Sequence, residues 1–168
     1  MMILNLLCVS LTATLALTSA IANPLPSGAD QINAELEARG DWHYPKTHRV
    51  IVGAGGKFRY DPEYVSAKIG DYIKFEFHPK NHTVTESSFS QPCNRIDGGF
   101  RTGFVPVPPG TKHFPTKVFK VADDKPHWFY CGQTGHCADG MVFAMKVNPP
   151  HKGNTFHKFR ETAKSSGK

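Results

Sequence analysis

The sequence predicts an all-β domain, arranged as an antiparallel sandwich or barrel. Short runs rich in β-branched and aromatic residues recur at close spacing between residues 49 and 147, with Gly and Pro between them. One of these runs, Tyr72–Phe77 (YIKFEF), alternates strictly between apolar and polar residues. Such alternation is typical of a strand with one buried face. We therefore expect several short strands packed around one core.

The expected strands follow one another along this region. They are residues 49–52, 64–68, 72–77, 82–85, 117–121, 127–130 and 141–147. Gly70-Asp71 and Pro79-Lys80-Asn81 are expected to turn the chain before and after the alternating strand. Residues 86–115 form a long interval that contains several Gly and Pro residues. A loop of this length in a compact domain is usually functional or held by a covalent bond.

The first 22 residues predict a secretory signal peptide. They are apolar, carry no charge and end in Ala20-Ile21-Ala22, a small-x-small cleavage signal. A transmembrane anchor is the alternative, but polar residues interrupt the stretch and no stop-transfer charges follow it. No later segment is long and apolar enough to span a bilayer. We expect a secreted protein, extracellular or in the cell wall, with no membrane span.

Two segments flank the expected domain at residues 49–150. Residues 23–48 form an N-terminal segment, with at most a short helix over residues 27–40. Residues 151–168 form a basic tail, which contributes to the net charge of +6. The tail predicts either a solvated, disordered end or a contact with an acidic cell-wall polymer, and not nucleic acid in a secreted protein. It ends in Ser-Ser-Gly-Lys without an apolar stretch, so we expect no glycosylphosphatidylinositol anchor.

The cysteine count indicates one thiol with a special role. Cys8 leaves with the signal peptide, so Cys93, Cys131 and Cys137 remain. Secretion exposes these three thiols to an oxidising environment, where two are expected to pair. The count alone does not say which two. A bond to a metal ion would protect the third.

The spacing Cys131-x4-His136-x4-Met141 predicts a metal site. The strand at residues 127–130 ends at Cys131, and the turn at residues 132–135 brings His136 back toward the sulfur. A second turn, residues 137–140, delivers Met141 to the next strand. Thiolate and thioether favour copper, and imidazole suits it too. One further His would complete the two-His, one-Cys set with a weak axial Met that defines a blue-copper, or type 1, site.

The fourth ligand is expected to be His82. Both His78 and His82 flank the turn after the alternating strand, but His82 opens the next strand and is better placed at the end of the sandwich. The backbone amide of Thr83 is then expected to donate toward the sulfur of Cys131, a contact that would tune the metal.

Three alternatives to copper remain less consistent with these residues. A buried Cys and a core Met would each be ordinary, but the unpaired secreted thiol would stay unexplained. Zinc is disfavoured because Met is a poor zinc ligand and structural zinc sites use four Cys or His ligands. A catalytic Cys–His pair is the third alternative.

Several motifs resemble a known family. They are the run Trp128-Phe129-Tyr130-Cys131-Gly132, then Gly135-His136-Cys137 and Gly140-Met141, and Asn81-His82-Thr83-Val84 upstream. In these residues the chain resembles the cupredoxin (blue copper) superfamily, and more narrowly the phytocyanins and the secreted cupredoxin-like proteins of fungi. The resemblance covers about residues 49–149.

The resemblance implies a Greek-key β-sandwich of seven to eight strands with one copper ion near one end. It also implies a disulfide between Cys93, in the long loop, and Cys137, beside the second His ligand. Many phytocyanins carry Gln at the axial position, where this chain has Met141, so the resemblance implies a higher reduction potential here.

The expected function is one-electron transfer rather than catalysis. A copper ion held by four protein ligands has no open position for a substrate. We expect a monomer whose unknown redox partner docks near His136, at Gly132, Gln133 and Gly135. The alternative is a copper-binding or cell-wall-associated protein without redox turnover. A copper oxidase is disfavoured because the chain has no His-x-His pair for further copper ions.

Overall fold

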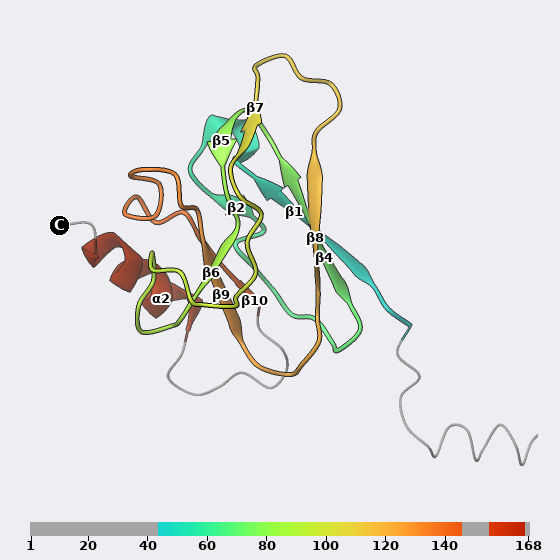
Figure 1. Cartoon of the computed structure of the whole chain (residues 1–168), viewed down its shortest axis with the longest axis vertical. Helices are drawn as coiled ribbons and strands as arrows, with labels where there is room; N and C mark the ends of the chain where they lie inside the picture. The colour runs from blue at the N-terminus through green and yellow to red at the C-terminus, as the bar shows by residue number, and fades with distance from the viewer. Residues whose placement is uncertain (1–43, 146–154, 167–168) are drawn as a thin grey trace, which may run out of the picture. The chain divides into compact units, whose positions relative to one another are not determined.

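A computed structural model describes residues 44–145 and 155–166 of the chain (Figure 1). The expected signal peptide at residues 1–22 and the short helix at residues 27–40 lie outside the described residues.

The described part of the chain is an all-β sandwich with one α-helix, which confirms the expected fold class. The first sheet contains, in spatial order, β2 (Tyr60–Asp61), β1 (Thr47–Val52), β4 (Tyr72–Phe77) and β8 (Thr116–Lys120). The second sheet contains β3 (Tyr64–Val65), β10 (Val142–Met145), β9 (His127–Tyr130) and β6 (Thr85–Ser87). A separate pair joins β5 (Lys80–His82) to β7 (Val105–Val107). A 3-10 turn, η1 (Ala54–Gly56), follows β1, and the α-helix is α2 (Phe156–Ser165).

The core lies between the two sheets. In β4 the apolar residues Ile73, Phe75 and Phe77 are fully buried, as the alternating pattern predicts. The second sheet supplies Phe129 and Phe143 to the same cluster. Cys131 and Met141 also belong to this cluster, so the two sulfur-bearing residues lie within the core rather than on the surface.

The expectation of purely antiparallel sheets is wrong for two strand pairs. β1 runs parallel to β4, and β3 runs parallel to β10, whereas the other pairs are antiparallel. Parallel neighbours require a crossover connection. Between β1 and β4 the chain visits the other sheet through β3, and this crossing lets β4 return in the same direction as β1.

Four short strands differ from the predicted positions. The single strand predicted at residues 82–85 is replaced by β5 and β6, which Thr83 and Val84 separate. β2 and β7 were not predicted, and β5 begins at Lys80, where the sequence predicted a turn. These strands have only two or three residues each, so their pairing depends on partner strands rather than on local preference. β7 includes Pro106, which a strand at the edge of a two-stranded pair tolerates.

The expectation of a disordered basic tail is wrong for residues 156–165, which form α2. The Thr155 hydroxyl caps this helix by accepting the backbone N–H of Lys158 at 3.2 Å. Phe159 and Ala163 lie on one helix face and are fully buried. The helix packs on the outer face of the second sheet, and the residues there are Trp128, Tyr130, Val142 and Ala144. Within the described residues, no helix has the length and apolar character needed to cross a membrane.

Candidate metal centre

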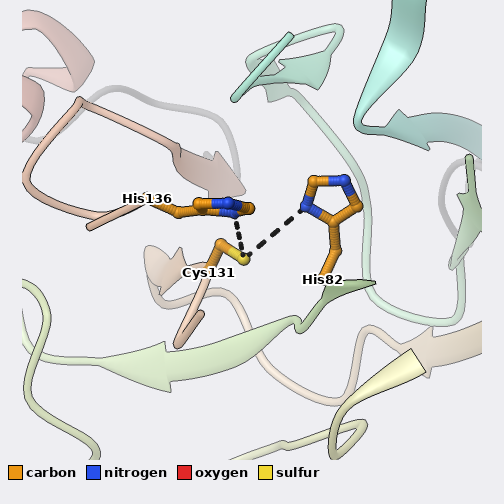
Figure 2. Close-up of side chains that lie close together, drawn as sticks. All are labelled: His82, Cys131 and His136. Atoms are coloured by element: carbon orange, nitrogen blue, oxygen red, sulfur yellow. Dashed lines mark hydrogen bonds between the residues drawn. The ribbon is translucent and has the colours of Figure 1, made fainter. Parts of the chain in front are cut away.

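Three donor atoms converge at one end of the sandwich. His82 ends β5, Cys131 follows β9, and His136 lies in the next turn (Figure 2). The sulfur of Cys131 lies 3.4 Å from Nδ1 of His136 and 3.9 Å from Nδ1 of His82. All three residues are buried, and their donor atoms lie within 4.8 Å of one another. The sequence-predicted His82, Cys131 and His136 are therefore brought together.

The ligand loop, residues 131–141, holds Met141 beside the other candidates. The backbone N–H of Cys131 donates to the carbonyl of Met141 at 3.1 Å, and the N–H of Met141 donates to the carbonyl of His136 at 2.9 Å. Within the loop, the N–H of Gly140 donates to the carbonyl of Cys137 at 2.8 Å. The side chain of Met141 is fully buried. The backbone thus ties all three residues of the Cys–His–Met spacing together.

His78, the alternative to His82, faces a different set of partners. Its Nε2 lies 2.9 Å from a carboxylate oxygen of Glu76. Its ring stacks on Phe114, with the two ring centroids 3.9 Å apart. His82, and not His78, is the histidine of this turn that reaches the sulfur of Cys131.

Gly53 makes room for the ring of His82. A Cβ atom at this position would lie only 2.3 Å from Nε2 of His82, and the residue has a φ of +83°, which favours glycine. Nε2 of His82 is buried and has no hydrogen-bond partner, so on this side of the ring packing against Gly53 takes the place of a hydrogen bond. The role of Gly53 was not predicted from the sequence. The glycine-rich run at residues 53–56 was the available signal, since glycine also marks close approaches of the backbone.

The ring of His136 stacks on Phe58, with centroids 3.9 Å apart and an interplanar angle of 25°. The ammonium of Lys80 lies 4.7 Å from the centroid of the Phe58 ring. His136 is 7% exposed and His82 is 0% exposed, so His136 is the more solvent-accessible of the two histidines. Phe58 was not singled out by the sequence.

Thr83 organises the surroundings of the sulfur. Its backbone N–H donates to the sulfur of Cys131 at 3.4 Å, which confirms the expected contact. Its hydroxyl accepts the N–H of Gly132 at 2.7 Å, and its carbonyl accepts the hydroxyl of the buried Tyr60 at 2.7 Å. Beside it, the side-chain amide of Asn81 donates to Gln133 at 3.1 Å. β5 and the ligand loop are therefore joined by several bonds across the site.

Burial sets the protonation states of the donors. It lowers the pKa of His82 to about 4, and the nearby His136 and Lys80 add to this effect. It also lowers the pKa of His136, again with help from Lys80. Both imidazoles are therefore neutral at pH 7, with lone pairs available to a metal. Burial raises the pKa of the Cys131 thiol, against the opposing effect of the Thr83 hydrogen bond, so a bound cation is needed to hold the thiolate.

The chemistry of this donor set fits one type 1 copper ion. Two imidazole nitrogens and one thiol sulfur lie close together, and Met141 is buried in the same core cluster as Cys131. Met is a poor partner for zinc, which prefers four Cys or His ligands in a structural site.

The disulfide between Cys93 and Cys137 is confirmed. It leaves Cys131 as the free, buried cysteine of the described residues. The bond joins residues 44 positions apart and ties the long loop to the ligand loop. Closing a loop of this length in the unfolded chain corresponds to about 4 kcal/mol of stabilisation in the chain-entropy model.

A buried carboxylate at the start of the long loop bonds to the middle of the same loop. Glu86 accepts the backbone N–H of Phe100 at 2.8 Å through one oxygen. Its other oxygen lies 2.6 Å from Nδ1 of His127, whose Nε2 lies 3.1 Å from Asp123. Burial alone would lower the pKa of His127, but the bonds to Glu86 and Asp123 outweigh burial and raise it. This network was not predicted from the sequence.

Comparisons with known proteins agree with this geometry. The chain is 27% identical over 122 residues to a protein of Arthroderma benhamiae described as "Probable GPI-anchored cupredoxin-1", covering 73% of this chain and 61% of that protein. It is 32% identical over 120 residues to an "Extracellular serine-rich protein" of the same organism, covering 71% of this chain and 45% of that protein. The chain thus spans less than two thirds of either curated relative. The first relative confirms the expected resemblance to the cupredoxins.

Among solved structures, spinach plantacyanin aligns with 61% of this chain and 99% of its own length. The sequence identity is 17% and the TM-score is 0.43. No protein-family model matches the chain.

Proposed function

We propose that this chain is a secreted type 1 copper protein that carries single electrons. The observation that supports this proposal most directly is the convergence of Nδ1 of His82, the sulfur of Cys131 and Nδ1 of His136, all buried, on one point. Met141 is the proposed axial ligand. Copper, when bound, supplies a one-electron couple between Cu(II) and Cu(I).

The protein's contribution is to hold its donors in one arrangement. His82 is packed against Gly53, and His136 is stacked on Phe58. Thr83 is fixed through both its hydroxyl and its carbonyl, so its N–H stays directed at the sulfur. Because the donors cannot move independently, their positions should change little between the Cu(II) and Cu(I) states. This rigidity suits fast electron transfer rather than metal storage.

A role in electron transfer, rather than in catalysis, is supported by the number of donors. Four protein side chains complete the proposed ligand set, whereas a catalytic metal keeps an open position for water or substrate. The cupredoxin-like relative is consistent with this proposal.

The proposed route for the electron passes through His136. Gly132, Thr134 and Gly135 are exposed around it, whereas His82 is fully buried. A redox partner would dock on this end through a small, weak interface, which suits transient electron-transfer encounters. One of the two relatives is described as GPI-anchored and the other as extracellular, which supports a location outside the cell.

The test is the optical and EPR spectrum of the Cu(II)-loaded protein. We expect an intense blue absorption and a small copper hyperfine splitting, both abolished by Cys131→Ser. His78→Ala is the matched control, because His78 belongs to the same turn but faces Glu76, and it should leave both signals intact. A colourless protein in excess Cu(II) would contradict the proposal.

Voltammetry separates electron transfer from the alternative of copper binding without redox turnover. A reversible one-electron wave, with similar spectra before and after a cycle, supports the carrier. Loss of copper on reduction would favour the alternative. The engagement of Arg160 with Glu63 argues against a free tail that tethers the domain to an acidic wall polymer.

A further inference from the structure

We propose that helix α2 is a positioning element for the metal site, which clamps the turn that carries Met141. The proposal rests on the proposed function for the role of Met141 as a ligand, but not for the clamp itself. Three sets of contacts support it: those of α2 with the second sheet, with Gly140 and with the disulfide.

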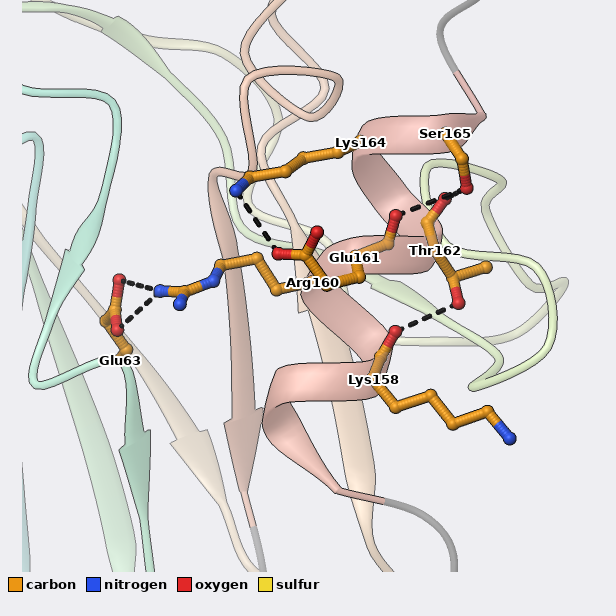
Figure 3. A network of polar contacts seen from close by, with 7 residues as sticks. All are labelled: Glu63, Lys158, Arg160, Glu161, Thr162, Lys164 and Ser165. Atoms are coloured by element: carbon orange, nitrogen blue, oxygen red, sulfur yellow. Dashed lines mark hydrogen bonds and ion pairs between the residues drawn. The ribbon is translucent and has the colours of Figure 1, made fainter.

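The first contacts fix α2 to the strands beside the site. Phe159 and Ala163 are fully buried against the second sheet. The guanidinium of Arg160 bonds to both carboxylate oxygens of Glu63, at 3.0 and 3.1 Å, as Figure 3 shows. The carbonyl of Glu63 in turn accepts the N–H of Ala144 in β10, at 3.2 Å. The helix is thus anchored to β10, the strand that begins directly after Met141.

The second contact is between two α2 side chains and the backbone of the ligand loop. A Cβ atom on Gly140 would lie 2.9 Å from Cε of Lys164 and 3.3 Å from Cγ of Arg160. The methylene groups of these two α2 side chains therefore lie close to the backbone of Gly140, in the space that a Cβ atom would take. Gly140 directly precedes Met141 and has a φ of +90°. A movement of this turn toward α2 would meet these two side chains.

The third contact covers the disulfide. Cys137 belongs to the same apolar cluster as Phe159 and Ala163. The sulfur of Cys93 lies 3.8 Å from the carbonyl oxygen of Ala163. α2 therefore contacts the turn at residues 137–140 at both of its ends. His82 and Thr83 are backed instead by Gly53 and Tyr60.

Because α2 supports the turn at residues 137–140 and other residues support His82, a change in α2 should affect the turn and not His82. Loosening α2 should release the turn and Met141 while His82 keeps its support. In the metal-free protein, the turn would open more often and expose the thiol of Cys131. In the copper-loaded protein, the axial interaction would change while the thiolate and imidazole bonds persist.

The experiment compares Lys164→Ala and Arg160→Met with Lys158→Ala in the full chain. Lys158 is the matched control because its side chain is exposed and points away from the sheets, whereas Arg160 and Lys164 point toward them (Figure 3). The first readout is the rate at which a thiol reagent modifies Cys131 in the metal-free protein. We expect a several-fold increase for Lys164→Ala and Arg160→Met, and none for Lys158→Ala.

The second readout is the EPR spectrum and reduction potential of the copper-loaded variants. We expect both to shift for Lys164→Ala and Arg160→Met while the blue absorption remains. Reduced thermal stability with an unchanged modification rate and spectrum would overturn the proposal and leave α2 as a cover alone. If Arg160→Met does not fold, Lys164→Ala decides, because it keeps Phe159 and the Arg160–Glu63 pair. A wild type that binds no copper would refute the proposed function, whereas the modification rate would still test the clamp.

Discussion

The two sheets of the sandwich differ in whether one or both of their faces are buried. In the first sheet, β4 buries one face and leaves Lys74 exposed on the other, where its neighbour Val118 on β8 is 51% exposed. In the second sheet, all four residues of β10 and three of the four in β9 are buried. The sandwich buries one face of these strands and α2 buries the other. Strict alternation therefore marks a strand with one cover, and a continuous apolar run marks a strand with two.

The same difference separates the candidate ligands. Cys131 and Met141 adjoin β9 and β10, the strands covered on both faces, whereas His82 belongs to the small β5–β7 pair. The sulfur donors are thus attached to the most deeply packed part of the molecule. We infer that the second sheet supports the two sulfur donors, whereas Gly53 and Tyr60, at the end of β1 and in β2 of the first sheet, support His82 and Thr83.

Loosening the packing of α2 on the second sheet should have the largest effect on stability. Phe159→Ala should lower the free energy of unfolding by about 3–5 kcal/mol, because it leaves a cavity under a fully buried aromatic side chain. Val118→Ala on the open face of the first sheet should change it by less than about 0.5 kcal/mol. Urea denaturation of both variants is the measurement. Equal losses would show that the two outer faces do not differ.

The second prediction concerns the disulfide that α2 covers. Replacing Cys93 and Cys137 together by Ser should cost about 2–4 kcal/mol, because the unfolded chain regains the freedom of the closed loop. Replacing both residues avoids a new free thiol. Urea denaturation under non-reducing conditions measures the loss. A double variant as stable as the wild type would show that packing alone holds the long loop.

The third prediction compares two neighbouring glycines, of which only one contacts a candidate ligand. Gly53→Ala and Gly55→Ala each place a Cβ on a residue with positive φ, and each should cost about 1–2 kcal/mol. Only the Cβ at Gly53 meets the ring of His82, while the one at Gly55 has nothing within 4 Å. Gly53→Ala should therefore weaken copper binding and Gly55→Ala should not. Titration with Cu(II), followed by absorbance, tests this, and equal affinities would refute the role of Gly53.

The smallest expected effects are opposite pH dependences in the two sheets. In the second sheet the pKa of His127 is raised above 6.5, so its contribution is complete below pH 6.5 and is lost as pH rises through the folded-state value. In the first sheet the hydrogen bond from Arg49 lowers the pKa of Glu76 from 4.5 to about 2, with smaller help from His78. Its contribution is complete above pH 4.5 and is lost as pH falls toward 2.

Comparing His127→Gln and Glu76→Gln with the wild type across pH isolates the two contributions. The stability difference for His127→Gln should shrink toward alkaline pH, and that for Glu76→Gln should shrink toward acidic pH. Differences that stay constant with pH would show that neither pair acts through its charge.

The sequence predicted the features that depend on local spacing. The strands at residues 72–77 and 127–130 have the predicted bounds, because alternation and aromatic residues mark them. Cys131, His136 and Met141 come together because short glycine-containing turns separate them. His82 was reached by its position after a turn, and the backbone amide of Thr83 followed from that choice.

The features that were missed depend on contacts between distant segments. Gly53 and Phe58 matter only because the chain after β1 folds back over the two histidines, and no spacing indicates that return. The helix α2 was not predicted because the positive charge of its sequence favours a solvated tail. Phe159 and Ala163 nevertheless have the helical spacing of a buried face. The apolar residues on both faces of β9 and β10 were the clue that a second cover exists.

The position of α2 over the disulfide also bears on oxidative folding. Cys93, Cys131 and Cys137 allow three different pairings, and only one of them leaves the thiol of Cys131 for a metal. Because α2 packs against the Cys93–Cys137 bond, we expect docking of the helix to favour that isomer over its two competitors. The ion pair that anchors the helix joins residues 97 positions apart, so this selection operates only after most of the domain has been synthesised. A segment that supplies no sulfur of its own would thereby help to decide which cysteine stays unpaired.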